Sequence, residues 1–201
     1  MKAVITGDII NSRKVASALW MGDLKDILKD YGNEPKDWEI YRGDSFQLII
    51  NPVDALEIAL LIKAAIKQHK TLDVRLAIGV GTVDYTANKV TESNGTAFVN
   101  SGESFEGLKK QTLGIQTPWS GFNETFRIIF QLVVLFADNW TTTSAEIIKK
   151  ALENPGINQK ELALALNRKS QSSISASLNR AGYEELKNVI EYYKQEIKKQ
   201  W

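Results

Sequence analysis

The stretch KAVITGDII, residues 2–10, decides how the N-terminal half of the chain folds. It is short, apolar and rich in β-branched residues, and Asn11 and Ser12 follow it directly. This pattern is typical of a buried strand that ends in a turn.

Apolar spacing in the following hundred residues predicts alternating helices and strands. Asn51-Pro52 is a typical helix start, because Asn accepts free N–H groups and Pro suits the first helical position. Gly79 and Gly81 end an alternating strand and permit a close approach of another element. The predicted elements are a helix over residues 15–31, strands over 38–41 and 46–50, a helix over 53–69, a strand over 74–81, a helix over 95–110 and a strand over 113–117.

The order β-α-β-β-α-β predicts an α+β fold of the ferredoxin-like kind. Its antiparallel sheet would place the first strand beside the hairpin at the centre, with both helices on one face. Residues 1–120 form this predicted domain, residues 121–140 a connecting helix, and residues 141–201 an all-α helix-turn-helix domain.

Two Gly-Asp pairs, Gly7-Asp8 and Gly43-Asp44, carry the chemistry of the first domain. Asp8 ends the buried strand and Asp44 lies in the hairpin turn, so the predicted topology brings the two acids together. Two carboxylates and a main-chain carbonyl such as that of Ile9 are hard oxygen ligands suited to Mg²⁺ or Mn²⁺ holding a nucleotide. The alternative is that Asp44 is an ordinary turn residue and Asp8 an ordinary strand-end acid.

Asp8-Ile9, Gly43-Asp44 and the run at residues 75–81 resemble the catalytic core of class III nucleotide cyclases and GGDEF-type diguanylate cyclases. Residues 7–13 and 42–47, together with the C-terminal helices, resemble more specifically the SatD family of bacterial proteins. The cyclase resemblance implies that Asp8 and Asp44 bind the metal, with the carbonyl of Ile9 as a further ligand.

The chain departs from the cyclase pattern at two positions. After Val99-Asn100 the position of the phosphate-contacting arginine is Ser104, and Ser45 replaces the glutamate of the GGDEF signature. Arg13, Arg42 or Arg75 could contact a phosphate instead, and Gly43 in the hairpin turn completes the candidate nucleotide site. The alternative is that each arginine is a solvated surface residue or a salt-bridge partner. Nucleotide binding is therefore favoured over catalysis.

A regular apolar seam marks the connecting helix. Its members recur at steps of four and three, which is typical of a helix that packs along its length on a partner: Phe122, Phe126, Ile129, Val133, Phe136 and Trp140. The partner is either the rest of the chain or a second copy. Because many DNA-binding proteins recognise two half-sites, we expect a homodimer.

Capping patterns divide the tail into short helices. Thr143 with Glu146 and Asn158 with Glu161 form capping boxes, and Gly182 is a helix stop. Ser170 caps a second short helix over residues 171–181, so the pair resembles the helix-turn-helix of bacterial regulators. The outward face of the second helix, with the cations at its two ends, would bind DNA through Lys169, Gln171, Ser172, Ser175, Asn179 and Arg180. The alternative is a three-helix interaction module with a polar face.

Composition excludes several classes of protein. Without cysteine there is no disulfide, thiolate metal site or cysteine nucleophile, and no apolar run is long enough to cross a membrane. We therefore expect a cytoplasmic protein. The sequence favours a transcriptional regulator that binds DNA and a metal-nucleotide. The alternatives are a metal-dependent cyclase or nucleotidyltransferase, and a ligand-free DNA-binding or scaffold dimer.

Overall fold

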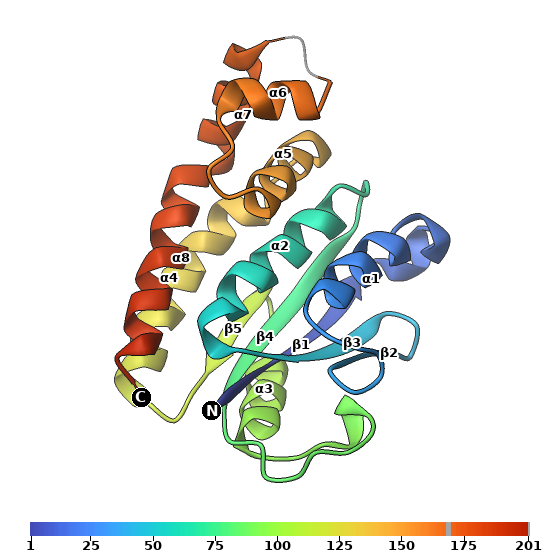
Figure 1. Cartoon of the computed structure of the whole chain (residues 1–201), viewed down its shortest axis with the longest axis vertical. Coiled ribbons are helices and arrows are strands. Elements are labelled where there is room, and N and C mark those ends of the chain that lie inside the picture. The colour runs from blue at the N-terminus through green and yellow to red at the C-terminus, as the bar shows by residue number, and fades with distance from the viewer. Residues whose placement is uncertain (168–169, 201) are drawn as a thin grey trace.

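A computed structural model describes residues 1–167 and 170–200 of the chain (Figure 1). A five-stranded sheet with interleaved helices occupies the N-terminal part, and an all-helical region follows it. The strands are β1 (Lys2–Ile10), β2 (Trp38–Tyr41), β3 (Ser45–Ile50), β4 (Asp73–Gly81) and β5 (Leu113–Gln116). The helices are α1 (Met21–Asp30), α2 (Ala55–Lys67), α3 (Thr96–Gly107), α4 (Ser120–Ala137), α5 (Thr142–Glu153), α6 (Gln159–Ala165), α7 (Gln171–Ala181) and α8 (Tyr183–Lys198).

The strand order is β2-β3-β1-β4-β5, so β1 lies at the centre as its apolar composition predicts. It pairs antiparallel with β3 on one edge and with β4 on the other. The last strand differs from the predicted antiparallel sheet, because β5 pairs parallel to β4. A parallel pair needs a crossover, and α3 supplies it between the two strands.

Helices cover both faces of the sheet. Ile78 and Val80 of β4 belong to the core cluster that includes α1 and α2. On the opposite face, a Cβ atom at Gly79 would lie 2.1 Å from the backbone nitrogen of Ser101 in α3. The predicted close approach at this glycine is therefore confirmed, and its partner is the backbone of α3.

The first predicted helix, over residues 15–31, begins later than its apolar spacing suggests. Residues Ser17–Leu19 form a short 3-10 turn, and α1 starts only at Met21. Leu19 is 64% exposed, whereas Trp20 is buried. Apolar spacing alone does not distinguish an exposed loop leucine from a helical one, because burial depends on the rest of the fold.

Helix α2 lies between the sheet and the C-terminal helices. Every one of its residues except Glu57 is buried, because α5 packs on the side that faces away from the sheet. Asn51 accepts a hydrogen bond from the N–H of Val53 (3.0 Å), as predicted, but Pro52–Asp54 form a 3-10 turn before the helix. The sheet and the C-terminal helices therefore share one hydrophobic core.

Helices α4 and α8 lie side by side along one edge of the molecule (Figure 1). The aromatic rings of Phe126 and Tyr193 meet edge to face with centroids 5.3 Å apart, and the hydroxyl of Tyr193 donates to the carbonyl of Pro52 (2.8 Å). The chain thus folds back so that its last helix contacts the 3-10 turn before α2. Among the described residues, no helix is long and apolar enough to span a membrane.

The predicted seam of α4 is only partly correct. The residues of this helix that are buried are Phe122, Phe126, Phe130, Val133 and Ala137. Ile129 and Phe136 are only half-buried, and Trp140 lies beyond the helix, where its indole N–H donates to the carbonyl of Ala181 (2.9 Å). Helix α4 packs on β5 and α8 of its own chain. Its buried residues therefore follow the 3.6-residue period of a straight helix and not the seven-residue repeat that was predicted.

Candidate functional site

The two aspartates lie at one corner of the sheet, where β1 ends and the hairpin turns. Asp8 pairs with Ser45, the residue after Asp44, and the N–H of Ile9 donates to the carbonyl of Asp44 (3.0 Å). The prediction that the topology brings these two segments together is therefore confirmed at the level of the backbone.

Asp8 is neutralised by an arginine of the neighbouring strand. Arg75 donates from Nε to Oδ1 (2.9 Å) and from Nη2 to Oδ2 (2.5 Å), so both carboxylate oxygens are engaged. The hydrogen bond to Asp8 raises the pKa of Arg75 above its ordinary value. The guanidinium also lies 5.1 Å from the ring centre of Phe105 on α3. This bidentate geometry holds both side chains in place.

Asp44 has a different partner. Its Oδ2 atom accepts a hydrogen bond from the hydroxyl of Ser12 (2.6 Å), and its Oδ1 atom lies 3.4 Å from the hydroxyl of Ser45. Each acid therefore has a protein partner of its own. The argument that a cation must neutralise a half-buried carboxylate does not apply to Asp8, because Arg75 already does so.

The corner has two of the oxygen ligands that a hydrated Mg²⁺ or Mn²⁺ needs, and phosphate and water would complete the set. No group of three or more His, Cys, Asp or Glu side chains capable of holding a metal occurs within residues 1–167 and 170–200. A cation could use Asp8 only after displacing Arg75. The arrangement fits a phosphate that competes for Arg75 better than it fits a metal alone.

The predicted phosphate contacts surround the corner on exposed loops. Arg13 follows Ser12, and Arg42 and Gly43 form the hairpin turn with positive φ angles of 54° and 84°. A Cβ atom at Gly43 would meet no atom within 4 Å, so the turn faces open space. An anion can therefore reach this turn without a change in the fold.

The C-terminal capping predictions have mixed outcomes. The capping box of Asn158 and Glu161 is present at the start of α6, Ser170 caps α7, and Gly182 ends α7 in the left-handed conformation. The predicted box at Thr143 is absent. Thr141 caps α5 instead, because its hydroxyl accepts the N–H of Ser144 (3.1 Å) and the helix begins two residues earlier.

Helix α7 has one buried and one exposed face. Ile174 and Leu178 are buried against the neighbouring helices, as predicted. The exposed face includes four of the predicted DNA-binding residues, Gln171, Ser172, Asn179 and Arg180, and Ser175 is half-buried at its edge. Lys169, the remaining predicted contact, lies outside the described residues. The exposed residues are amides, hydroxyls and a guanidinium, a set suited to base edges and phosphates.

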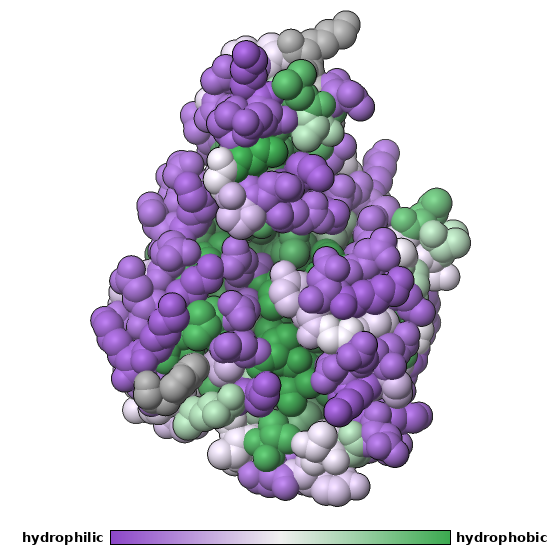
Figure 2. Space-filling view, in the orientation of Figure 1, coloured by the Kyte–Doolittle hydropathy of each residue, from purple (hydrophilic) through white to green (hydrophobic). Residues whose placement is uncertain are grey.

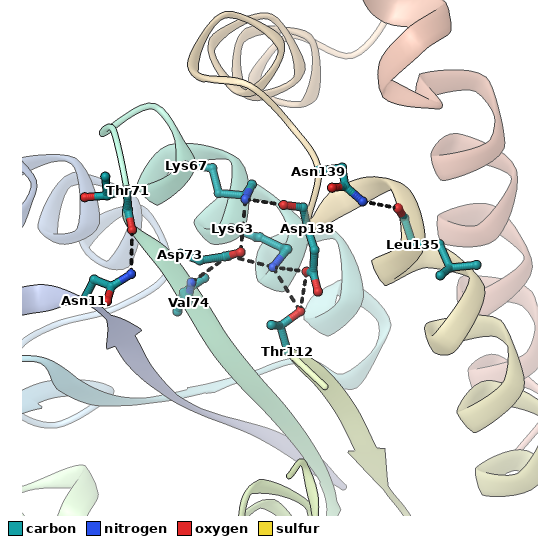
Figure 3. Close-up of polar contacts among 10 residues, drawn as sticks. All are labelled: Asn11, Lys63, Lys67, Thr71, Asp73, Val74, Thr112, Leu135, Asp138 and Asn139. Carbon is teal, nitrogen blue, oxygen red and sulfur yellow. Dashed lines mark hydrogen bonds and ion pairs between the residues drawn. The ribbon is translucent and has the colours of Figure 1, made fainter. Parts of the chain in front are cut away.

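A network of buried charges was not found by sequence reasoning (Figure 3). Lys63 of α2 has no exposed surface, and its Nζ atom lies 2.7 Å from carboxylate oxygens of both Asp73 and Asp138. Lys67, one helical turn later, contacts the other oxygen of Asp73 (3.1 Å) and the main-chain carbonyl of Asp138 (2.7 Å). The only signal in the sequence is two lysines four residues apart within an apolar helix.

The network joins three distant parts of the chain. Asp73 starts β4 and Asp138 ends α4, while the hydroxyl of Thr112 before β5 donates to Asp138 (2.5 Å) and accepts from Lys63 (3.1 Å). The charges therefore fix the end of α4 against α2 and the sheet. Since every charge has an opposite partner, this network is a structural element and not a reactive site.

Comparison of the chain with protein-family models finds no matching family, and a search of curated proteins finds no match either. The function of these sites is therefore inferred from their geometry and chemistry.

Proposed function

We propose that the chain is a DNA-binding regulator whose helix α7 enters a groove of DNA. One observation carries the proposal: α7 buries Ile174 and Leu178 while it directs Gln171, Asn179 and Arg180 to solvent. Helix α6 ends at Ala165 and α7 begins at Gln171, a spacing close to that of a helix-turn-helix, whose second helix lies in the major groove.

The side chains of α7 have separate parts in this proposal. The amides of Gln171 and Asn179 can each form paired hydrogen bonds with an adenine edge, and the hydroxyls of Ser172 and Ser175 can contact neighbouring bases. Arg180, together with Lys169, would contact phosphates and set the orientation of the helix without selecting a sequence.

The test compares α7 variants in a selection from random DNA followed by binding titrations. Substituting both Gln171 and Asn179 with Ala should relax the selected sequence, because each amide pairing contributes about 1–3 kcal/mol of discrimination. Arg180→Ala should weaken binding to all sequences and flatten its salt dependence, because fewer counterions are released. Lys198→Ala on the exposed part of α8 is the charge-matched control. Failure of the wild type to shift any DNA at low salt would leave an interaction module as the function.

The N-terminal part is proposed to be the ferredoxin-like unit that the sequence resembles in nucleotide cyclases and in the SatD family. The order β2-β3-β1-β4 with antiparallel pairing, and α1 and α2 on one face, supports this proposal. Its ligand would be a nucleotide whose phosphates contact Arg75, Arg13, Arg42 and the backbone at Gly43. These groups surround the corner that holds Asp8 and Asp44.

Binding of Mg²⁺ or Mn²⁺ with that nucleotide requires Arg75 to release Asp8, and a phosphate favours this by competing for the guanidinium. Thermal-shift measurements with ATP and GTP, each with and without the cation, test the proposal. We expect Asp8→Asn and Asp44→Asn to abolish the cation-dependent shift while both proteins stay folded. If both variants keep the full shift, the paired-acid site is wrong.

A homodimer is the proposed oligomeric state, and the surface that supports it is not the predicted seam. Three large apolar residues remain exposed along one face of α4, namely Ile128 (53%), Leu132 (59%) and Leu135 (69%). Their spacing of four and three residues forms a continuous stripe. A stripe of this kind on a helix is typical of a contact with another protein surface.

Two other functions remain as alternatives. Conversion of a nucleoside triphosphate by the purified chain, abolished by Asp44→Asn, would support a metal-dependent cyclase or nucleotidyltransferase. A wild-type protein that dimerises but binds no nucleotide would support a ligand-free DNA-binding or scaffold protein. The binding experiments above, together with an assay of nucleotide conversion and a measurement of the oligomeric state, therefore distinguish all three functions.

A further inference from the structure

A cavity of about 860 Å³ lies between the C-terminal helices and α2. Its walls come from α5, the loop at residues 154–158, α6, the start of α7 and the first three turns of α8. Glu57, the one residue of α2 that is not buried, closes the side nearest the sheet. The volume is within the range of sites that bind small organic molecules.

The floor of the cavity is apolar. It consists of side chains from the four C-terminal helices α5 to α8 and from the loop between α5 and α6, namely Leu152, Ile157, Leu162, Leu178, Ile190 and the ring of Tyr183. Figure 2 shows hydrophobic side chains between hydrophilic ones over the C-terminal helices. A ligand that fills this space must therefore have an apolar body, which loses its contact with water on binding.

The rim of the cavity has more negative than positive charge. Three carboxylates, Glu57, Glu184 and Glu191, share it with two ammonium groups, Lys187 and Lys194. Lys194 is 2.7 Å from Glu57 and 3.4 Å from Glu191, so one ammonium serves two carboxylates. Lys187 is 3.3 Å from Glu184, so every carboxylate of the rim has an ammonium partner. Because Glu57 and Glu191 share Lys194, these three side chains together have one negative charge in excess.

Tyr183 shows the effect of these charges on the cavity. Burial raises the pKa of its hydroxyl, and the carboxylates of Glu184 and Glu57 raise the same pKa further. The ammonium of Lys187 lies 5.5 Å from the centre of the ring, so the ring face already contacts one cation. An aromatic ring beside carboxylates is a typical binding environment for organic cations.

We propose that this cavity binds an organic cation with an apolar body, held by the apolar floor and by the carboxylates of Glu57 and Glu191. Such a ligand supplies the positive charge that the rim lacks and takes the shape that the floor requires. An anion of the same shape would meet the excess carboxylate charge and bind weakly. The proposal concerns ligand binding in the absence of DNA, so it does not depend on whether α7 binds DNA, although Gln171 of α7 also lines the cavity.

Two probe ions of equal shape and opposite charge test the proposal directly. Tetraphenylphosphonium and tetraphenylborate each have four phenyl groups around one central atom, so their apolar surfaces are nearly the same. Isothermal titration of the full chain should show saturable binding of one tetraphenylphosphonium ion. Tetraphenylborate should bind at least about tenfold more weakly, because its charge is repelled by the rim. Equal affinities, or no phosphonium binding at millimolar concentration, would overturn the proposal.

Variants of the rim locate the binding site. Glu57→Gln should weaken phosphonium binding by about tenfold, because this carboxylate is largely shielded from water by the cavity wall. Glu191→Gln, at an exposed position that tolerates substitution, should weaken it by a smaller factor and keeps the test valid if Glu57→Gln unfolds the protein. Glu185→Gln on the same helix, outside the cavity, is the matched control and should leave the affinity unchanged. Loss of affinity in the control alone would place the ion elsewhere.

Discussion

Replacing Lys63 with Met should destabilise the whole chain, because Lys63 is the central group of the buried charge network. Its ammonium contacts carboxylate oxygens of Asp73 and Asp138 at 2.7 Å each, and the hydroxyl of Thr112 at 3.1 Å. Methionine has a similar length and no charge, so it keeps most of the packing and removes all three contacts.

The loss of stability in Lys63→Met depends on the contacts that the carboxylates of Asp73 and Asp138 keep in the variant. Asp73 keeps Lys67 at 3.1 Å and the N–H of Val74 at 2.8 Å, so much of its charge stays compensated. Asp138 keeps the hydroxyl of Thr112, but its side chain is 32% exposed and water compensates part of the loss. Removing one partner of a buried pair costs about 3–5 kcal/mol. The remaining contacts place the cost near the lower limit, about 3 kcal/mol.

Thermal unfolding followed by circular dichroism measures this cost. For a chain of this length, each kcal/mol lowers the melting temperature by about 2–4 °C, so we expect a decrease of about 6–12 °C. Lys29→Ala is the control, because Lys29 pairs with Asp26 on the surface with both side chains more than half exposed. An exposed pair of this kind contributes about 0–1 kcal/mol. If Lys63→Met melts within the range of the control, the network does not stabilise the fold and the reasoning is refuted.

Three further changes test other parts of the structure. Gly79→Ala should destabilise the protein by about 1–3 kcal/mol or more, because the added Cβ would lie 2.1 Å from the backbone of α3. The control in the same melting experiment is Gly102→Ala, which has no neighbour within 4 Å and should be neutral or slightly stabilising. Leu132→Asp should convert a dimer to a folded monomer in sedimentation experiments, and a wild-type monomer at micromolar concentration would eliminate the dimer. The stability advantage of the wild type over Lys194→Gln should be constant from neutral pH to about pH 10.5 and should be lost as the pH rises further. Burial lowers the pKa of Lys194, but Glu57 and Glu191 together raise it above its ordinary value, and a raised pKa contributes stability only while the lysine stays protonated. Equal advantages at neutral and at high pH would show that the pair contributes through packing alone.

The elements that the sequence predicts well are those with local causes. The strand at residues 2–10 has the predicted bounds and the predicted central place in the sheet. The caps at Asn158 and Ser170 and the stop at Gly182 depend on atoms within three residues of each other, so a short pattern suffices to find them. The buried and exposed faces of α7 follow from its period in the same way.

Packing between distant elements decides the rest. The buried seam of α4 is shifted from its predicted position because β5 and α8 of the same chain cover this helix, and nothing in the local sequence records which neighbours a helix has. The same reason applies to the start of α1 at Met21 and to the parallel pairing of β5. In each case the apolar residues were found, but their partners were not.

The sequence by itself determined the order of the strands and helices of this protein and the two acid-bearing segments that lie side by side at the corner of the sheet, because periodicity and capping act over a few residues. Only the tertiary structure decided the charges that surround those acids. Asp8 meets Arg75 across 67 residues of sequence, and the lysines of α2 meet Asp138 at the end of α4. Coulomb interactions depend on distance in space and on burial, and neither quantity exists until the chain has folded.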